Sequence, residues 1–120
     1  MNNLNQRVGR LPFMAPEILS NQPYNGINAD IFSLWQILFI LVTGIKGFET
    51  ANVNDQFYRN IIQHSIDHYC QIIDYHDLNL SQDFKNLFIR MVDPDPAQRP
   101  TIAQILNDDP WMKEINDLND

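Results

Sequence analysis

The sequence predicts an all-α chain, because its apolar residues follow helical spacing, its polar residues supply helix caps, and no segment has the pattern of a strand. Phe84, Leu87, Phe88 and Met91 lie at i, i+3, i+4 and i+7, and Ser81 precedes them as an N-cap. Nowhere do apolar and polar residues alternate as in a half-buried strand. We therefore expect about five short helices and no sheet.

Composition limits the chain to one globular domain or part of one. Of its 120 residues, 44% are hydrophobic and 19% are charged, and the net charge is -7. This acidic balance argues against nucleic acid or an anionic membrane surface as a partner, since both bind through Lys and Arg. The polar N-terminus and the single cysteine, Cys70, give no sign of secretion, so we expect a cytoplasmic location. The longest apolar stretch, Ile31 to Val42, is shorter than the ~20 residues that span a bilayer.

The N-terminal part predicts little regular structure. Residues 1–7 are polar, and we expect them to be irregular. Pro12 and Pro16 exclude a regular element through this region, although Pro16 suits the first turn of a short helix. Asn25-Gly26 is a turn signal, which places a loop at Pro23 to Asn28.

A strong helix is predicted from Ile31 to Thr43. Asp30 is suited to be its N-cap or an acid of its first turn, and Gly44 is suited to end it. The helix is apolar on nearly every face, which is typical of a helix in the middle of a protein. Other helices are therefore expected to surround it.

Two shorter helices are predicted after the loop at Gly44 to Val53. Asn54 or Asp55 caps one through Ile66, with three apolar residues facing inward: Phe57, Ile61 and Ile62. The other is expected within residues 67–74. Because His64 and His68 lie at i, i+4, they have a spacing that can bind zinc. Cys70 is off their face and no fourth ligand is placed, so we expect no metal site.

The C-terminal part predicts a turn and one more helix. Asp93 and Asp95 lack the Gly and the distal Glu of a calcium loop, so they indicate a turn that ends the helix before them. Thr101 to Gln104 match a capping box, with two buried residues expected behind it, Ile105 and Leu106. Pro110 is expected to stop this helix, Trp111 to pack beneath it, and residues 112–120 to form an acidic tail.

Four ordered motifs resemble the eukaryotic protein kinase family: Ala15-Pro16-Glu17, Asp30-Ile31-Phe32-Ser33-Leu34, Asp95-Pro96-Ala97-Gln98-Arg99-Pro100-Thr101 and Leu106-Asn107-Asp108-Asp109-Pro110-Trp111. They resemble the end of the activation segment, the start of the central helix, the D-P-x-x-R-P-T segment and the closing Pro-Trp. The residues of these motifs are most similar to those of serine/threonine kinases of the calcium/calmodulin-dependent type. The resemblance implies a partial C-terminal lobe of the protein-kinase-like fold at residues 8–111, between the irregular residues 1–7 and the tail.

The resemblance also implies roles for particular residues. Glu17 and Arg99 would form a buried ion pair that holds the activation segment to the helical lobe. Asp30 would anchor the catalytic loop by accepting its backbone hydrogen bonds. Four residues would belong to the loop that receives the substrate residue beside the phosphorylated one: Gly9, Leu11, Pro12 and Phe13. A protein or peptide substrate is therefore the implied partner.

The motifs that carry phosphoryl transfer do not occur in the chain. These are the Gly-rich loop, the strand lysine, the H-R-D loop and the D-F-G aspartate. We therefore predict no catalytic residue and no ATP or magnesium site in these 120 residues, and expect both cofactors only in a full-length parent. The chain would be a fragment that keeps the substrate-docking and scaffold part of a kinase whose family transfers the ATP γ-phosphate to protein Ser or Thr.

Departures from the family pattern leave alternatives open. Arg10 stands where the family usually has Thr or Ser, Trp35 stands where it usually has Gly, and Ile40 replaces an acid of basic-directed kinases. Arg10 and Trp35 together favour an inactive copy, and Ile40 argues against a strong preference for arginine upstream of the phosphosite. The alternative function is a catalytically dead relic or a non-enzymatic binding module that uses the peptide-docking surface. An all-α interaction domain unrelated to kinases would require the motifs to be coincidental. The central helix also implies a cover, which is the missing N-terminal kinase part or a partner, and without it the chain is expected to be unstable, dye-binding or oligomeric.

Overall fold

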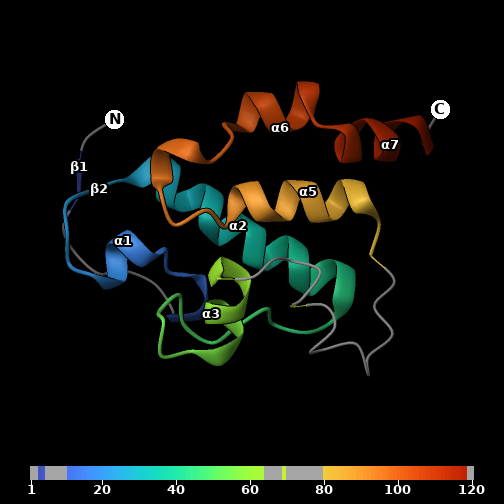
Figure 1. Ribbon diagram of the computed structural model, residues 1–120. Coiled ribbons are helices and arrows are strands. Elements are labelled where there is room, and N and C mark those ends of the chain that lie inside the picture. The colour runs from blue at the N-terminus through green and yellow to red at the C-terminus, as the bar shows by residue number, and fades with distance from the viewer. Residues whose placement is uncertain (1–2, 5–10, 64–68, 70–79, 119–120) are drawn as a thin grey trace.

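The computed structural model describes residues 3–4, 11–63, 69 and 80–118 (Figure 1). Its elements, in chain order, are β1 (Asn3–Leu4), the 3-10 helix η1 (Leu11–Phe13), α1 (Pro16–Leu19), β2 (Tyr24–Asn25), α2 (Gly26–Thr43), α3 (Gln56–Gln63), α5 (Gln82–Met91), the 3-10 helix η3 (Pro96–Gln98), α6 (Ile102–Asp108) and α7 (Pro110–Leu118). The prediction of a helical chain is confirmed. The prediction of no strand is wrong at one place, because β1 and β2 pair antiparallel and give structure to residues 3–4, which were expected to be irregular.

The long helix α2 lies at the centre of the molecule. Figure 1 shows α5, α6 and α7 on one side of α2, with α1 and α3 on the other. Direct packing joins α2 to η1, α5, β2 and η3, while α7 packs against α5 and α6. The arrangement is a set of short helices around one central helix, as expected for the helical lobe of the protein kinase fold.

The start of α2 corrects the predicted N-cap. Asn25, not Asp30, caps the helix: its side-chain oxygen accepts hydrogen bonds from Ile27 N at 2.9 Å and Asn28 N at 3.3 Å. Asp30 therefore lies inside the helix and is exposed. The turn signal at Asn25-Gly26 is a cap and first residue, so no loop runs to Asn28. The helix ends as predicted, because Gly44 adopts a left-handed conformation with φ 80°.

The length of α2 also bears on membrane insertion. With 18 residues and a mean hydropathy of 1.5, α2 is long and apolar enough to cross a bilayer by these two properties alone. A core helix of a soluble protein has the same properties. Six α2 side chains are buried against the other elements: Ala29, Ile31, Phe32, Trp35, Gln36 and Phe39.

Aromatic rings form the centre of the core. Trp35 is 1% exposed and stacks on Phe48 with ring centroids 5.1 Å apart. Phe88 of α5 meets the Trp35 ring edge-on at 4.4 Å. The four apolar residues predicted on α5 are all buried, and Ser81 caps that helix by accepting from Phe84 N, so this prediction is confirmed.

The helix α3 begins as predicted but buries a different ring. Asp55 Oδ1 accepts from Phe57 N at 2.9 Å and Tyr58 N at 3.1 Å, which caps the helix. Tyr58 is 2% exposed, whereas Phe57 is 39% exposed, so the prediction of Phe57 as an inward residue is wrong. Ile61 is buried as predicted and Ile62 is half-buried. The rest of this predicted helix and the predicted helix at 67–74 lie outside the described residues, Tyr69 excepted.

The C-terminal helices differ from the prediction at their boundary. The predicted capping box is confirmed: Gln104 N donates to Thr101 Oγ1, and Thr101 N donates to Gln104 Oε1. Pro110 begins α7 and does not end the helical structure, since proline suits the first turn of a helix. The expected tail is therefore helical as far as Leu118. Leu106 is also exposed, against the prediction.

Candidate functional site

One ion pair joins the A-P-E triplet near the start of the chain to the D-P-x-x-R-P-T segment near its end. Arg99 Nη1 lies 2.7 Å from Glu17 Oε2, and Arg99 Nη2 lies 2.8 Å from Glu17 Oε1. This two-pronged geometry is the strongest form of an arginine–carboxylate contact. The Arg99 side chain is 0% exposed and that of Glu17 is 11% exposed, so the pair is shielded from water.

Arg99 also fastens parts of the backbone. Its Nη1 donates to the Asn28 carbonyl at 2.9 Å, and its Nε donates to the Asp93 carbonyl at 2.9 Å. The guanidinium carbon lies 5.1 Å from the centre of the Phe32 ring, a distance that allows a cation–π contact. One side chain therefore fixes α1, the first turns of α2 and the turn after α5 relative to one another.

The turn after α5 forms as predicted. Asp93 Oδ1 accepts from Asp95 N at 2.9 Å, and Asp95 Oδ1 accepts from Ala97 N at 3.0 Å. Tyr58 lies near this charged cluster, and burial raises its pKa to about 12. Arg99 lowers this pKa and the carboxylates of Glu17 and Asp93 raise it, both less strongly than burial does.

The predicted substrate-binding residues lie at a short helical segment on α2. Leu11, Pro12 and Phe13 form η1. Ser33 Oγ of α2 donates to the Phe13 carbonyl at 2.5 Å, and Gln36 Nε2 donates to the Pro12 carbonyl at 2.8 Å. Gly9 and Arg10 lie outside the described residues. The described part of the segment is therefore held by side chains of the central helix.

A cavity of about 440 Å³ opens beside η1, and we call it the Leu11 pocket. Its described lining residues are Leu11, Leu19, Thr50, Asn52, Asn54 and Asp55. The Asp55 carboxylate is engaged inside the fold, because Oδ2 accepts from Glu49 N and Thr50 N while Oδ1 caps α3. The lining therefore offers two leucine side chains and polar groups to a guest, and the Asp55 carboxylate is already bonded to backbone N–H groups, which suits an uncharged side chain.

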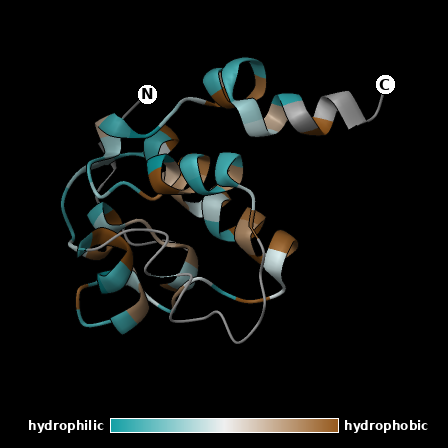
Figure 2. Ribbon diagram, turned by 45° about the vertical axis from the view of Figure 1, so that its right-hand side comes forward, coloured by the Kyte–Doolittle hydropathy of each residue, from teal (hydrophilic) through white to brown (hydrophobic). Residues whose placement is uncertain are grey.

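The predicted anchor, Asp30, lies on a different face. Within the described part of the chain, no hydrogen bond or ion pair involves its carboxylate, and its side chain is exposed. It lines an apolar groove of about 440 Å³ along α2, with Ile27, Ile31, Ser33, Leu34, Ile37 and Ile102. Leu41 and Val42 of the same helix add exposed apolar side chains beyond Ile37, and Leu41 is 76% exposed. Figure 2 shows apolar residues reaching the C-terminal turns of α2.

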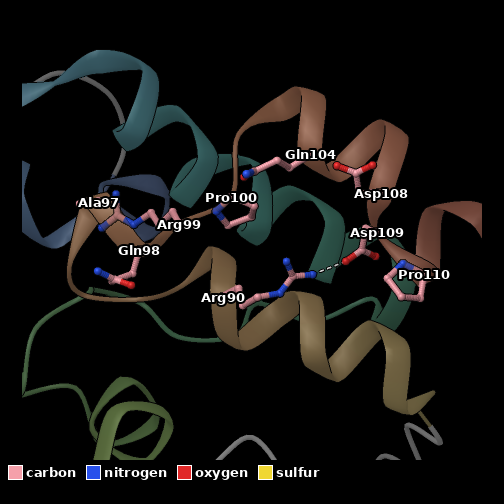
Figure 3. A pocket seen from close by; sticks show the side chains of 9 residues that line it. All are labelled: Arg90, Ala97, Gln98, Arg99, Pro100, Gln104, Asp108, Asp109 and Pro110. Carbon is pink, nitrogen blue, oxygen red and sulfur yellow. Dashed lines mark hydrogen bonds and ion pairs between the residues drawn. The ribbon is translucent and has the colours of Figure 1, made fainter.

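The structure contains a second ion pair that sequence analysis missed. Arg90 of α5 binds Asp109, which lies between α6 and α7 and is 3% exposed (Figure 3). Asp109 Oδ2 also accepts from Trp111 N at 2.9 Å, and the Trp111 ring lies 5.0 Å from Phe84. Both residues line a polar cavity of about 380 Å³. No local pattern pairs these two residues, since 19 positions separate them.

Trp35, the departure from the family glycine, is accommodated by another glycine. A Cβ atom on Gly47 would lie 2.3 Å from the Trp35 ring, so only glycine allows the indole to lie there. Among the described residues, Trp35 Nε1 is the buried side-chain polar atom without a hydrogen-bond partner. The backbone of the 44–53 loop thus approaches the Trp35 ring closely at Gly47.

The histidines weighed as zinc ligands, His64 and His68, lie outside the described residues, as does Cys70. In the segments that the structure describes, no group of three or more His, Cys, Asp or Glu side chains is placed to hold a metal ion.

The helical lobe is closed by a buried Glu–Arg pair between the A-P-E triplet and the D-P-x-x-R-P-T segment, as the resemblance to protein kinases implies. The sequence matches the family model described as the protein kinase domain over residues 1–112. The chain belongs to this family, and the curated relatives that it matches include serine/threonine kinases.

Three of these relatives show how much is shared. "CBL-interacting serine/threonine-protein kinase 26" of Arabidopsis thaliana is 36% identical over 111 residues, which cover 92% of this chain and 23% of the relative. "Protein kinase kin1" of Schizosaccharomyces pombe is 35% identical over 87% of this chain and 10% of the relative. "Serine/threonine-protein kinase SRK2G" of Arabidopsis thaliana is 34% identical over 90% of this chain and 30% of the relative. The chain thus spans less than a third of each of these relatives.

Proposed function

We propose that the chain is the substrate-docking and scaffold part of a serine/threonine kinase domain of the calcium/calmodulin-dependent type. The observation that carries this proposal is the Leu11 pocket, which adjoins the segment that resembles the family's substrate loop. The segment is bonded to α2 through Ser33 and Gln36, so the pocket wall is preorganised. The residues of the four kinase-like motifs support the calcium/calmodulin-dependent type.

The parent activity in this proposal is transfer of the ATP γ-phosphate to a protein hydroxyl. The motifs that bind ATP and magnesium are absent from the 120 residues, so the parent kinase would supply them from another segment. The share of this chain is to hold the substrate residue next to the phosphorylated one. Positioning of this kind, together with electrostatic stabilisation, accounts for almost all of phosphoryl-transfer catalysis by a protein.

The exposed face of α2 is where we propose that the missing N-terminal kinase part docks. Asp30 lies on this face without a partner among the described residues, as expected if the catalytic loop is to donate hydrogen bonds to it. Exposed apolar side chains at Ile37, Leu41 and Val42 extend the face, and burying them would give the interface its free energy. The isolated chain should therefore bind a hydrophobic dye or self-associate.

Peptide binding by the purified chain tests the docking role. A library of labelled peptides, varied around a central serine, is screened by fluorescence anisotropy against the wild-type chain and Leu11→Asp. We expect peptides with an uncharged residue beside the serine to bind. Leu11→Asp should weaken their binding by at least about tenfold, because a carboxylate would replace an apolar side chain in the lining. The control is Leu106→Asp, since Leu106 is also exposed but lies on α6. Equal binding by the wild type and Leu11→Asp would contradict the proposal.

A catalytically dead relic that still binds peptides is the second candidate. Arg10 favours it, because this cation replaces a hydroxyl that the family places against its catalytic groups. Trp35 is weaker evidence for loss of kinase activity than the sequence suggests, because its ring packs closely against Gly47 and Phe48. Both candidates share the docking surface and differ in whether the complete domain transfers phosphate.

A further inference from the structure

We infer that Gln36 is a positioning residue that sets the distance between the two walls of the Leu11 pocket. The inference rests on the proposed function, in which this pocket receives the substrate residue. Gln36 is fully buried on α2, in a helix whose other buried residues are apolar. A buried amide in such a place is costly unless all its hydrogen bonds are made.

The bonds of Gln36 reach both walls. Its Nε2 donates to the Pro12 carbonyl at 2.8 Å and to the Phe48 carbonyl at 3.0 Å, and its Oε1 accepts from Gly47 N at 2.9 Å. Pro12 adjoins Leu11, which lines one wall, and Phe48 lies two residues before Thr50, which lines the other. One side chain therefore connects the two walls through α2.

The side-chain chemistry explains why this position holds glutamine. Two carbonyls and one N–H converge on it, and a primary amide supplies two donors and an acceptor. An apolar residue of similar size would fill the space but leave three buried backbone groups without partners. Only side-chain packing would then hold the two walls, and the distance between them would be less well defined.

The segment that leads into the far wall is itself fixed at Gly47 and Phe48, which makes it a reference for the near wall. The Tyr69 hydroxyl donates to the Gly47 carbonyl at 2.6 Å, and the Trp35 ring lies against the Gly47 Cα. Phe48 stacks on the same ring. Through Gln36, the short η1 segment is thus tied to a rigid part of the core. Ser33, by contrast, bonds to η1 at Phe13 and to its own helix at Ala29.

Amide hydrogen exchange of the full chain tests the coupling. We compare wild type, Gln36→Met, which keeps the shape but removes the amide, and Ser33→Ala as the matched control. The reporters are Met14 N, which donates to the Leu11 carbonyl in η1, and Gly47 N, in the segment that leads into the other wall. In Gln36→Met we expect both to exchange at least about tenfold faster, and in Ser33→Ala only Met14. A purely global loss of stability, reproduced by Leu87→Ala, would instead accelerate α5 amides to the same extent.

The result that overturns the inference is Gln36→Met with fast exchange at Gly47 and unchanged exchange at Met14, because the walls would then be independent. If Gln36→Met does not fold, side-chain amide exchange in the wild-type protein tests whether the Gln36 amide is held by these hydrogen bonds. The Gln36 Nε2 protons should exchange at least about tenfold more slowly than those of Gln63, which is exposed. Equal rates would contradict the inference.

Peptide affinity separates this inference from the proposed function. We expect Gln36→Met to weaken peptide binding by about tenfold and Ser33→Ala by less. Coupled walls in a chain that binds no peptide would refute the docking role and leave the role of Gln36 intact. Normal peptide binding by Gln36→Met, with both reporters protected as in wild type, would refute the role of Gln36 and leave the docking role intact.

Discussion

Removing one partner of the Glu17–Arg99 pair should be among the most damaging single substitutions in the chain. Glu17→Gln keeps the size of the side chain but removes the charge that faces a guanidinium with no solvent exposure. Arg99 keeps its bonds to the Asn28 and Asp93 carbonyls, which do not neutralise it. Stranding a buried charge in this way costs ~3–5 kcal/mol. That is a large share of the ~5–15 kcal/mol that stabilises a typical domain.

Equilibrium unfolding in urea measures this cost. With a slope of ~1–3 kcal/mol per molar urea, the unfolding midpoint should fall by about 2 M while the slope stays unchanged. The matched control is Glu49→Gln, because Glu49 pairs with Lys46 at 3.6 Å with side chains 72% and 50% exposed. We expect the control to cost less than about 0.5 kcal/mol. A Glu17→Gln protein as stable as the control would refute the reasoning that burial of the pair matters.

Three further substitutions test other parts of the account. Gly47→Ala should lower the free energy of unfolding by about 1–3 kcal/mol, because its Cβ would lie 2.3 Å from the Trp35 ring, and a wild-type melting temperature would contradict that contact. Thr101→Ala should cost about 1 kcal/mol in urea unfolding, because the capping box with Gln104 is lost, and a cost below the error would count against it. The unfolded chain releases the Tyr58 proton near pH 10 and the folded chain only near pH 12, so folded stability should fall as pH rises through this window, by about 2–3 kcal/mol at its end. The free energy of unfolding of Tyr58→Phe, measured in urea, should fall less steeply from pH 10 to pH 12 than that of the wild type. Parallel pH dependences of the two proteins would show that the Tyr58 pKa is not raised.

The features that sequence predicted best are local ones. Ser81 and Thr101 cap helices because their hydroxyls lie within three residues of the N–H groups they accept from, and Gly44 ends α2 by its own conformation. The buried face of α5 follows from helical periodicity alone. The long-range contact between Glu17 and Arg99 was expected from motif resemblance, since no local rule connects residues 82 positions apart.

The features that sequence missed depend on packing. Asn25 and Asp30 are both acceptable caps, and the choice between them is made by where the chain enters the core. Gln36 looks like one polar residue on an apolar helix until two carbonyls and an N–H are placed around it. Pro110 can end one helix or begin the next with the same backbone angle, so its role depends on α7 packing against α5.

The most direct test of the proposed function is a chimera. Residues 8–111 replace the corresponding segment of the Arabidopsis "CBL-interacting serine/threonine-protein kinase 26", with either Arg10 or Arg10→Thr, and transfer of labelled γ-phosphate from ATP to a peptide is measured beside the isolated chain. If this lobe is a competent docking scaffold, the Arg10→Thr chimera transfers phosphate and the isolated chain does not. If the chimera that keeps Arg10 also transfers phosphate, the chain is part of an active kinase. If only the Arg10→Thr chimera transfers phosphate, the chain is the catalytically dead relic. A folded chimera that binds ATP but transfers no phosphate in either form, or transfer by the isolated chain, would contradict the account.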